Sequence, residues 1–186
     1  KTEVSIEDEQ RKLAQAEALM NTEKKIIITD TNIITDLYIA GVLEEFILLD
    51  NIYISDIVKT NEINNKTCDL RLINKFKTVE ANSMELLEAS YLSIVEKKLS
   101  IFDLLNFIIC RDNNYILATG DNRLKEYSEN HNIEVIRTLK IIKDMYNSKN
   151  ISNKKSIDAR NKLKESSKTR IPIKEIDNLI NYLKKY

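Results

Sequence analysis

At residues 26–32 the sequence reads Ile-Ile-Ile-Thr-Asp-Thr-Asn, an apolar run that ends in a carboxylate and small polar side chains. Short runs rich in Ile favour a strand that is buried on both faces, as in a parallel sheet. A second apolar run, residues 115–119, ends in the same way, because Gly120 and Asp121 follow it directly. Ligands of open α/β sheets bind just beyond the carboxyl ends of the strands. We therefore expect Asp30 and Asp121 to lie at a functional site.

The rest of the chain predicts an alternation of strands and helices. Further strands are expected at residues 51–54, 78–81 and 133–136, and helices over residues 33–38, 42–47, 55–62, 70–76, 83–95, 100–110 and 124–130. Ser55 is expected to cap the helix that follows it. Strands that alternate with helices indicate an α/β fold with a parallel sheet covered by helices.

We divide the chain into three parts. The sequence of residues 1–19 predicts a helical arm that starts at Ser5. This arm comes from an expression vector, from a neighbouring reading frame or from the protein itself. Residues 20–147 hold the predicted α/β domain. Residues 148–186 predict a basic extension, first a linker or weakly docked helix and then a last amphipathic helix that begins at Pro172.

Charge is distributed unevenly along the chain. The whole sequence has 29 basic and 29 acidic residues, but residues 137–186 hold 14 basic against 5 acidic, which leaves 15 against 24 in residues 1–136. A basic tail on an acidic body fits either of two interpretations. The tail is a solvated helix, or it contacts the phosphate backbone of a nucleic acid.

Several classes of function are excluded by residue counts. Two cysteines, Cys68 and Cys110, and one histidine, His131, are too few for a disulfide framework or a Cys/His zinc site. Two glycines exclude a glycine-rich phosphate loop. We expect Cys110 in the core and His131 on a surface turn. The apolar runs are too short for a membrane span and no signal peptide is evident, so we expect a cytoplasmic protein and no membrane partner.

Two further acids strengthen the case for chemistry by carboxylates. Glu62 lies in the otherwise neutral segment 55–63, and Asp103 lies in the first turn of a strongly apolar helix. Each acid also has a simpler explanation, because a strand-end Asp often caps the next helix and Asp103 can pair with Ser100 in a capping box. If the acids converge, their repulsion is relieved by a hard divalent cation such as Mg²⁺ or Mn²⁺.

Taken together, four motifs resemble the pattern of PIN-domain nucleases, and within them the VapC-like toxins. The motifs are Asp-Thr-Asn at residues 30–32, Glu62 at the end of residues 55–62, Asp103 in Leu-Ser-Ile-Phe-Asp at residues 99–103, and Leu-Ala-Thr-Gly-Asp-Asn-Arg-Leu at residues 117–124. The resemblance spans about residues 25–146. The basic extension and the arm before Met20 depart from the minimal domain.

The resemblance implies a three-layer α/β/α fold whose parallel sheet has the strand order 3-2-1-4-5. It implies a Mg²⁺- or Mn²⁺-dependent endoribonuclease in which Asp30, Glu62, Asp103 and Asp121 bind metal and carry the catalysis. Asn32 and Thr119 would be supporting residues. It also implies RNA as substrate, a cognate antitoxin and a possible homodimer.

Two alternatives are weighed against this nuclease. One is a non-catalytic or complex-regulated nucleic-acid-binding module of the same fold. The other, a haloacid-dehalogenase-like phosphatase, is disfavoured because it needs a second Asp at position 32, which is Asn.

Overall fold

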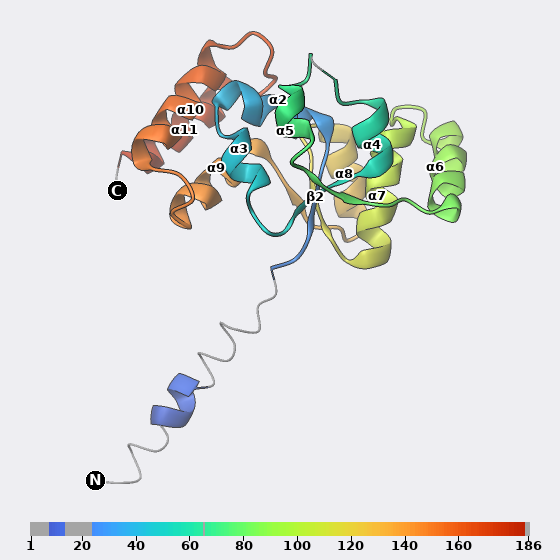
Figure 1. Ribbon diagram of the computed structural model, residues 1–186, viewed down its shortest axis with the longest axis horizontal. Helices are drawn as coiled ribbons and strands as arrows, with labels where there is room; N and C mark the ends of the chain where they lie inside the picture. Colours follow the sequence, from blue (N-terminus) through green and yellow to red (C-terminus); the bar gives the residue numbers. More distant parts are fainter. Residues whose placement is uncertain (1–7, 14–23, 65, 185–186) are drawn as a thin grey trace.

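Five parallel strands form one sheet in the order β3-β2-β1-β4-β5 (Figure 1). The structure is a computed structural model that describes residues 8–13, 24–64 and 66–184. The strands are β1 Ile27–Thr29, β2 Ile52–Ser55, β3 Lys77–Val79, β4 Ile116–Ala118 and β5 Val135–Ile136. The predicted order 3-2-1-4-5 is therefore confirmed, and β1 lies at the centre of the sheet.

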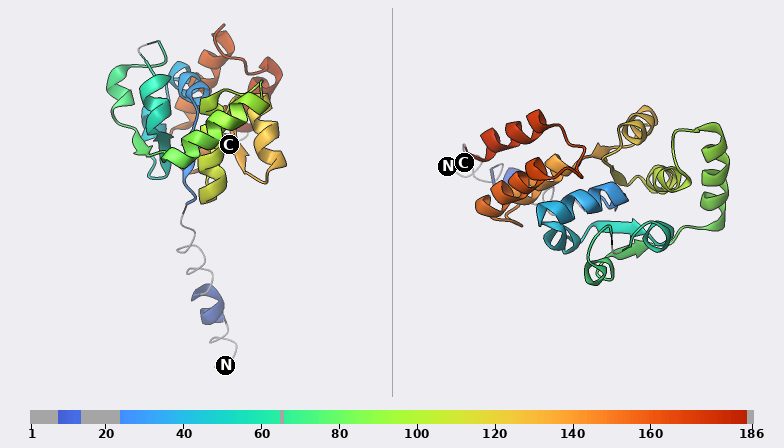
Figure 2. Two further views of the ribbon diagram at one scale, coloured as in Figure 1. Left: turned by 90° about the vertical axis from the view of Figure 1, so that its right-hand side faces the viewer. Right: turned by 90° about the horizontal axis from the view of Figure 1, so that it is seen from above.

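Helices cover both faces of the sheet, which confirms the predicted three-layer α/β/α fold. They are α2 Thr31–Ala40, α3 Leu43–Ile47, α4 Asp56–Asn61, α5 Leu70–Ile73, α6 Ser83–Val95, α7 Ile101–Asn113, α8 Asn122–Asn130, α9 Thr138–Asn147, α10 Asn153–Glu165 and α11 Ile173–Leu183. Helices α2, α3 and α9 contribute to one core, whereas α6, α7 and α8 contribute to the other. Figures 1 and 2 show these two groups on opposite sides of the sheet.

Alternation along the strands supplies both cores. Ile28 of β1 and Leu117 of β4 pack with α7 and α8, whereas Ile52 and Ile54 of β2 and Ala118 pack with α2 and α3. Successive side chains of a strand point to opposite faces, so each short Ile- and Leu-rich strand contributes to two layers. This burial on both faces is the reason that the strands appear as continuous apolar runs in the sequence.

Most of the predicted elements are confirmed within a residue or two, but the predicted role of Ser55 is wrong. The Ser55 hydroxyl is buried and donates to no atom of the described chain, although the residue stands at the N-cap of α4. The carboxylate of Asp56 accepts from the Ile57 amide (2.8 Å) and the Ala81 amide (3.1 Å) instead. Because Ser55 ends a strand that is buried on both faces, its side chain lies within the fold.

Cys110 and His131, which were given no catalytic role, lie in the core and on a surface turn as predicted. Cys110 is buried in the core on α7, and burial raises the pKa of its thiol. His131 is exposed at the end of α8, and its ring packs edge-on against Phe107. Within the described residues no helix has the length and apolar character that crossing a bilayer requires.

The C-terminal extension differs from the prediction of a linker or weakly docked helix. Residues 153–165 form α10, which packs against α2, and α11 packs against α10 and α9. Ala159 and Leu163 of α10 and Ile176 and Leu179 of α11 belong to the same core as α2. The last helix is confirmed. At the other end of the chain residues 8–13 are helical, and the remainder of the predicted arm lies outside the described residues.

Candidate functional site

Asp30 lies at the carboxyl end of the central strand and is only 4% exposed. Its Oδ1 accepts a hydrogen bond from the Ile33 amide (2.9 Å), so the residue caps α2 as the simpler interpretation expected. Its Oδ2 accepts from the hydroxyl of Thr119, at the end of the neighbouring strand β4. The first turn of α2 and the Thr119 hydroxyl thus hold the Asp30 carboxylate in a fixed position at the carboxyl end of the central strand.

Burial raises the pKa of the Asp30 carboxyl from 3.8 to about 7. The hydrogen bonds from Thr119 and from the Ile33 amide lower the pKa, because they stabilise the charged form. The charges of Asp103 and Glu62 raise it further. Asp103 and Glu62 therefore lie close enough to Asp30 to affect its ionisation.

Glu62 reaches the site from the end of α4, where it is the C-terminal cap residue. Its Oε2 accepts a hydrogen bond of 2.5 Å from the hydroxyl of Thr31, the residue that follows Asp30. Burial raises the pKa of Glu62, the Thr31 bond lowers it, and the charge of Asp103 raises it. Thr31 thus fixes Glu62 beside the first turn of α2, a role that the sequence interpretation missed although Thr31 stands within the quoted motif.

Asp103 forms the capping box that its alternative interpretation predicted. Its Oδ2 accepts from the Ser100 amide (2.9 Å), and the Ser100 hydroxyl accepts from the Asp103 amide (3.1 Å). This bond and the electrostatic effect on Asp30 do not exclude each other, because a carboxylate has two oxygens. Asp103 Oδ1 accepts no hydrogen bond from the described part of the chain, nor does Glu62 Oε1.

Asp121 lies beside this group and not within it. Its Oδ1 caps α8 by accepting from the amides of Arg123 (2.8 Å) and Leu124 (2.9 Å). Its own amide donates to the Thr119 hydroxyl (3.1 Å), which in turn donates to Asp30. The predicted supporting role of Thr119 thus has a structural basis, in that this hydroxyl connects Asp30 to the start of α8. Asn32 is exposed and lines a pocket with Gly120 and Asp121.

The donor set fits a divalent cation held by one or two carboxylates. No group of three or more Asp, Glu, His or Cys side chains in the described residues is arranged to hold a metal ion, so the four acids do not form a closed cage. Mg²⁺ is usually bound by one or two carboxylates together with waters and substrate phosphate, and it does not need such a cage. Asp30 with one neighbouring acid, Glu62 or Asp103, would fit that coordination.

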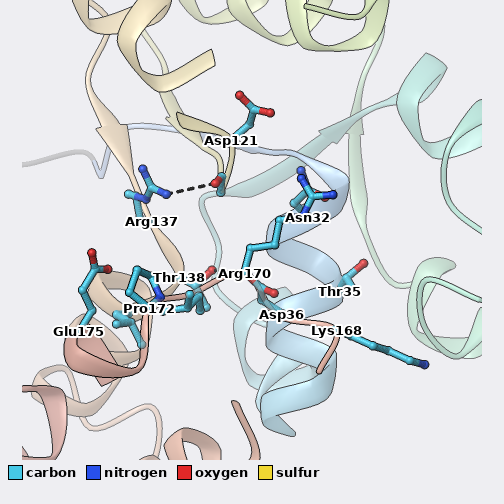
Figure 3. Close-up of a pocket in the computed structure, with 13 residues that line it drawn as sticks. Asn32, Thr35, Asp36, Asp121, Arg137, Thr138, Lys168, Arg170, Pro172 and Glu175 are labelled. Atoms are coloured by element: carbon cyan, nitrogen blue, oxygen red, sulfur yellow. Dashed lines mark hydrogen bonds between the residues drawn. The ribbon is translucent and has the colours of Figure 1, made fainter. Parts of the chain in front are cut away.

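A pocket of about 210 Å³ lies at the carboxyl ends of β4 and β5 (Figure 3). Of the four predicted acids, Asp121 lines it, whereas Asp30, Glu62 and Asp103 do not. The floor of the pocket includes Asp36, whose Oδ2 accepts from the Thr138 hydroxyl (2.9 Å). Burial raises the pKa of Asp36, while hydrogen bonds from Thr138 and Thr169 and the charge of Arg137 lower it. Asp36 therefore holds together α2, the start of α9 and the segment that precedes α11.

Arg137 is a further residue that the sequence interpretation missed. Its guanidinium donates to the Gly120 carbonyl (3.1 Å), the bond drawn in Figure 3, and to the Asn122 side chain (2.7 Å). Arg137 directly follows β5, so the strand-end rule that selected Asp30 and Asp121 could have found it. Lys168 and Arg170 also line the pocket, but they belong to an irregular segment that gave no signal.

Comparison with known proteins adds only a distant structural likeness. No family model and no curated protein matches the sequence. Among solved structures, the chain is similar to the crystal structure of PAE2754 from Pyrobaculum aerophilum, with 14% sequence identity and a TM-score of 0.48 over 63% of this chain and 93% of that chain. At this identity and score the likeness carries no argument about function.

Proposed function

We propose that the chain is a Mg²⁺- or Mn²⁺-dependent endoribonuclease of the PIN-domain type. The observation that supports it best is the buried carboxylate of Asp30 at the carboxyl end of the central strand, where Glu62 and Asp103 from two other elements influence its ionisation. Acids with raised pKa values that gather at a strand edge are candidates for a functional site on physical grounds. The resemblance of the four sequence motifs to PIN-domain nucleases supplies the reaction class.

The proposed chemistry assigns separate tasks to the residues. Asp30 is the principal ligand, and Glu62 and Asp103 each have an oxygen that accepts no hydrogen bond from the described residues. Thr119 and Thr31 orient Asp30 and Glu62. When bound, Mg²⁺ or Mn²⁺ would activate a water and stabilise charge on the leaving oxygen of the phosphodiester.

The test is cleavage of a mixed panel of structured and single-stranded RNAs by the full chain, with Mn²⁺ or with a chelator. Asp30→Asn keeps the side-chain shape and the cap of α2 but removes the charge, so we expect cleavage to fall by roughly 10²-fold or more. The matched control is Asp50→Asn. Asp50 is 81% exposed in the turn before β2, at the opposite edge of the sheet, and its variant should cut like the wild type.

Equal cleavage by the wild type and Asp30→Asn would indicate a contaminating nuclease and would overturn the proposal. Cleavage that persists in the chelator would contradict its metal dependence. Loss of cleavage in both Asp30→Asn and Asp50→Asn would point to a general defect of folding and would remove Asp30 from its proposed role.

A complex-regulated nucleic-acid-binding module is the second candidate. The specific observation in its favour is that Asp103 and Asp121 both use a carboxylate oxygen to cap their own helices, so each has a structural role that needs no catalysis. In that case the wild type would bind RNA in the cleavage assay without cutting it. The predicted antitoxin, the toxin role and the homodimer stay proposals that rest on the resemblance alone.

A further inference from the structure

The segment between α10 and α11, residues 166–172, brings the C-terminal extension to the candidate site. Lys168, Arg170 and Pro172 of this segment line the same pocket as Asn32 and Asp121. The hydroxyl of Thr169 interacts with Asp36 on α2, which fixes the segment at this edge of the sheet. We call residues 166–172 the connector.

A second pocket adjoins the first and shares Asp121, Arg137, Arg170 and Glu175 with it. It is also lined by Arg123 and Lys125 from the first turns of α8. The two pockets together form a groove that runs across the ends of β4 and β5. Five basic side chains from α8, the start of α9 and the connector line this groove: Arg123, Lys125, Arg137, Lys168 and Arg170.

The groove presents some of its cations in a fixed position and leaves others free. Arg137 is held by Gly120 and Asn122, so its guanidinium is preorganised. The Arg170 and Lys168 side chains are exposed and make no hydrogen bond or ion pair with the described part of the chain. Figure 3 shows Arg170 extending from the connector toward Asn32. A planar guanidinium without a protein partner is suited to pair with a phosphate through two hydrogen bonds.

Three acids also line the groove, and they do not cancel this charge. Asp36 is half-buried with a raised pKa, and its carboxyl is bound by Thr138. Asp121 has one oxygen committed to the start of α8. Glu175 is exposed at the rim. Lys125 is paired with Glu129 (3.2 Å), so four further cations face these three acids and leave a small surplus of positive charge in the groove.

We propose that this groove binds the phosphate backbone of single-stranded RNA, and that the connector supplies part of the binding surface through Lys168 and Arg170. The proposal rests on the proposed nuclease function. Asp30 itself does not line the groove, but Asn32 and Asp121 do, and the Thr119 hydroxyl connects Asp121 to Asp30, so a strand in the groove would pass beside the Asp30 group. A single strand is the ligand that fits best, because proteins bind single-stranded nucleic acid in positively charged grooves that follow its backbone.

The test measures binding of a short, fluorescently labelled, mixed-sequence single-stranded RNA by anisotropy, in a chelator and over a series of salt concentrations. Lys168→Gln with Arg170→Gln removes two exposed charges from the groove. Each phosphate contact on a single strand contributes about 0.7 to the salt dependence of binding, so the slope should fall by about 1.4 and the affinity by roughly tenfold or more. Arg170→Lys keeps the charge but cannot form two parallel hydrogen bonds with a phosphate, so it should retain the salt dependence and lose part of the affinity.

The matched control is Lys24→Gln with Lys154→Gln, which removes two exposed lysines from other surfaces. Lys24 lines a pocket with Asn51 at the opposite edge of the sheet, and Lys154 lies in the first turn of α10. This control should leave both the affinity and the slope close to the wild-type values. A control that weakens binding as much as the groove variant would overturn the proposal, because it would mean that charge alone, and not the groove, holds RNA.

Further outcomes would also overturn it. The proposal fails if the wild type binds no RNA, or if the groove variant has unchanged affinity and salt dependence. It also fails if the groove variant binds or cuts RNA better than the wild type, because the connector would then cover the site. The failure of the nuclease proposal remains distinguishable. In that case the chain would not cut RNA with Mn²⁺, yet binding would still depend on Lys168 and Arg170.

Discussion

The hydroxyl of Thr119, at the end of β4, donates a hydrogen bond to Oδ2 of Asp30, at the end of β1. The same hydroxyl oxygen accepts from the Asp121 amide (3.1 Å). The bond to Asp30 lowers the pKa of that carboxyl and so opposes the effect of burial. Thr119 therefore favours the charged form of Asp30, the form that a divalent cation requires.

The first prediction separates the hydroxyl of Thr119 from its methyl group. Thr119→Val keeps the shape but leaves a buried carboxylate without its donor, so we expect a loss of roughly 1–3 kcal/mol in the free energy of unfolding at pH 8. Thr119→Ser keeps the hydroxyl and should retain most of this stability. Urea denaturation of both variants is the measurement. A larger loss in the Ser variant would mean that methyl packing, and not the hydrogen bond, is the main role of Thr119.

The second prediction concerns Asp30 and pH. Because burial raises its pKa from 3.8 to about 7, the folded chain keeps this proton at pH values where the unfolded chain has released it. The contribution of Asp30 to stability is therefore complete below about pH 4 and is lost as the pH rises through 7. Asp30→Asn has no such titration. Relative to the wild type, this variant should gain roughly 2–4 kcal/mol between pH 4 and pH 8, because one pKa unit corresponds to about 1.4 kcal/mol.

Urea denaturation of the wild type and Asp30→Asn at several pH values measures this difference. Asp50→Asn serves as the control, since an exposed carboxylate should give a nearly constant difference from the wild type over the same range. A flat difference for Asp30→Asn would mean that Asp30 ionises in the folded chain much as it does in the unfolded chain.

The third prediction is that metal stabilises the folded chain in a pH-dependent manner. A cation that binds only the folded state raises the free energy of unfolding, and the increase grows with the logarithm of the cation concentration above its Kd. Since it must displace the proton of Asp30, millimolar Mn²⁺ or Mg²⁺ should raise the melting temperature more at pH 8 than at pH 6. The increase should vanish in Asp30→Asn. An equal increase in wild type and variant would place the bound metal elsewhere.

The fourth prediction separates the two roles of Asp103. Ser100→Ala removes the hydroxyl that accepts from the Asp103 amide, so it should cost about 1 kcal/mol of stability and leave RNA cleavage nearly unchanged. Asp103→Asn can still accept from the Ser100 amide but has no charge, so it should cost little stability and reduce cleavage. A thermal melt measures the stability of each variant, and the RNA assay measures its cleavage. Equal effects of the two variants on cleavage would make Asp103 a structural residue only.

Local rules of sequence predicted the strands of a parallel sheet and the acids at their ends, whereas the strand order followed from the resemblance to PIN-domain nucleases. Asp30 and Asp121 follow short apolar strands, and the capping box of Ser100 and Asp103 is contained in four consecutive residues. The sequence could not decide whether Asp103 is a cap or part of a site. The structure assigns it both a cap and an electrostatic effect on Asp30, and these effects arise between elements that are far apart in the chain.

The position of the extension could not be predicted for a different reason. α10 packs against α2, and its buried residues are Ser156, Ala159, Arg160 and Leu163. Only Leu163 has the long apolar side chain that marks a core-facing helix, so the pattern was too weak to predict this packing. Since the connector depends on that packing, the placement of Lys168 and Arg170 beside Asp121 has no signal in the local pattern.

The last prediction tests whether the extension shares the core of the α/β domain. Leu163 of α10 is 0% exposed and belongs to the cluster that includes α2 and α3. Leu163→Ala should therefore destabilise the whole chain by roughly 2–5 kcal/mol in a single unfolding transition. Ile173→Ala, at a position of α11 that is 58% exposed, is the matched control and should stay within about 0.5 kcal/mol of the wild type. Calorimetry would contradict this prediction if Leu163→Ala split the transition in two, because the extension would then unfold as a separate unit.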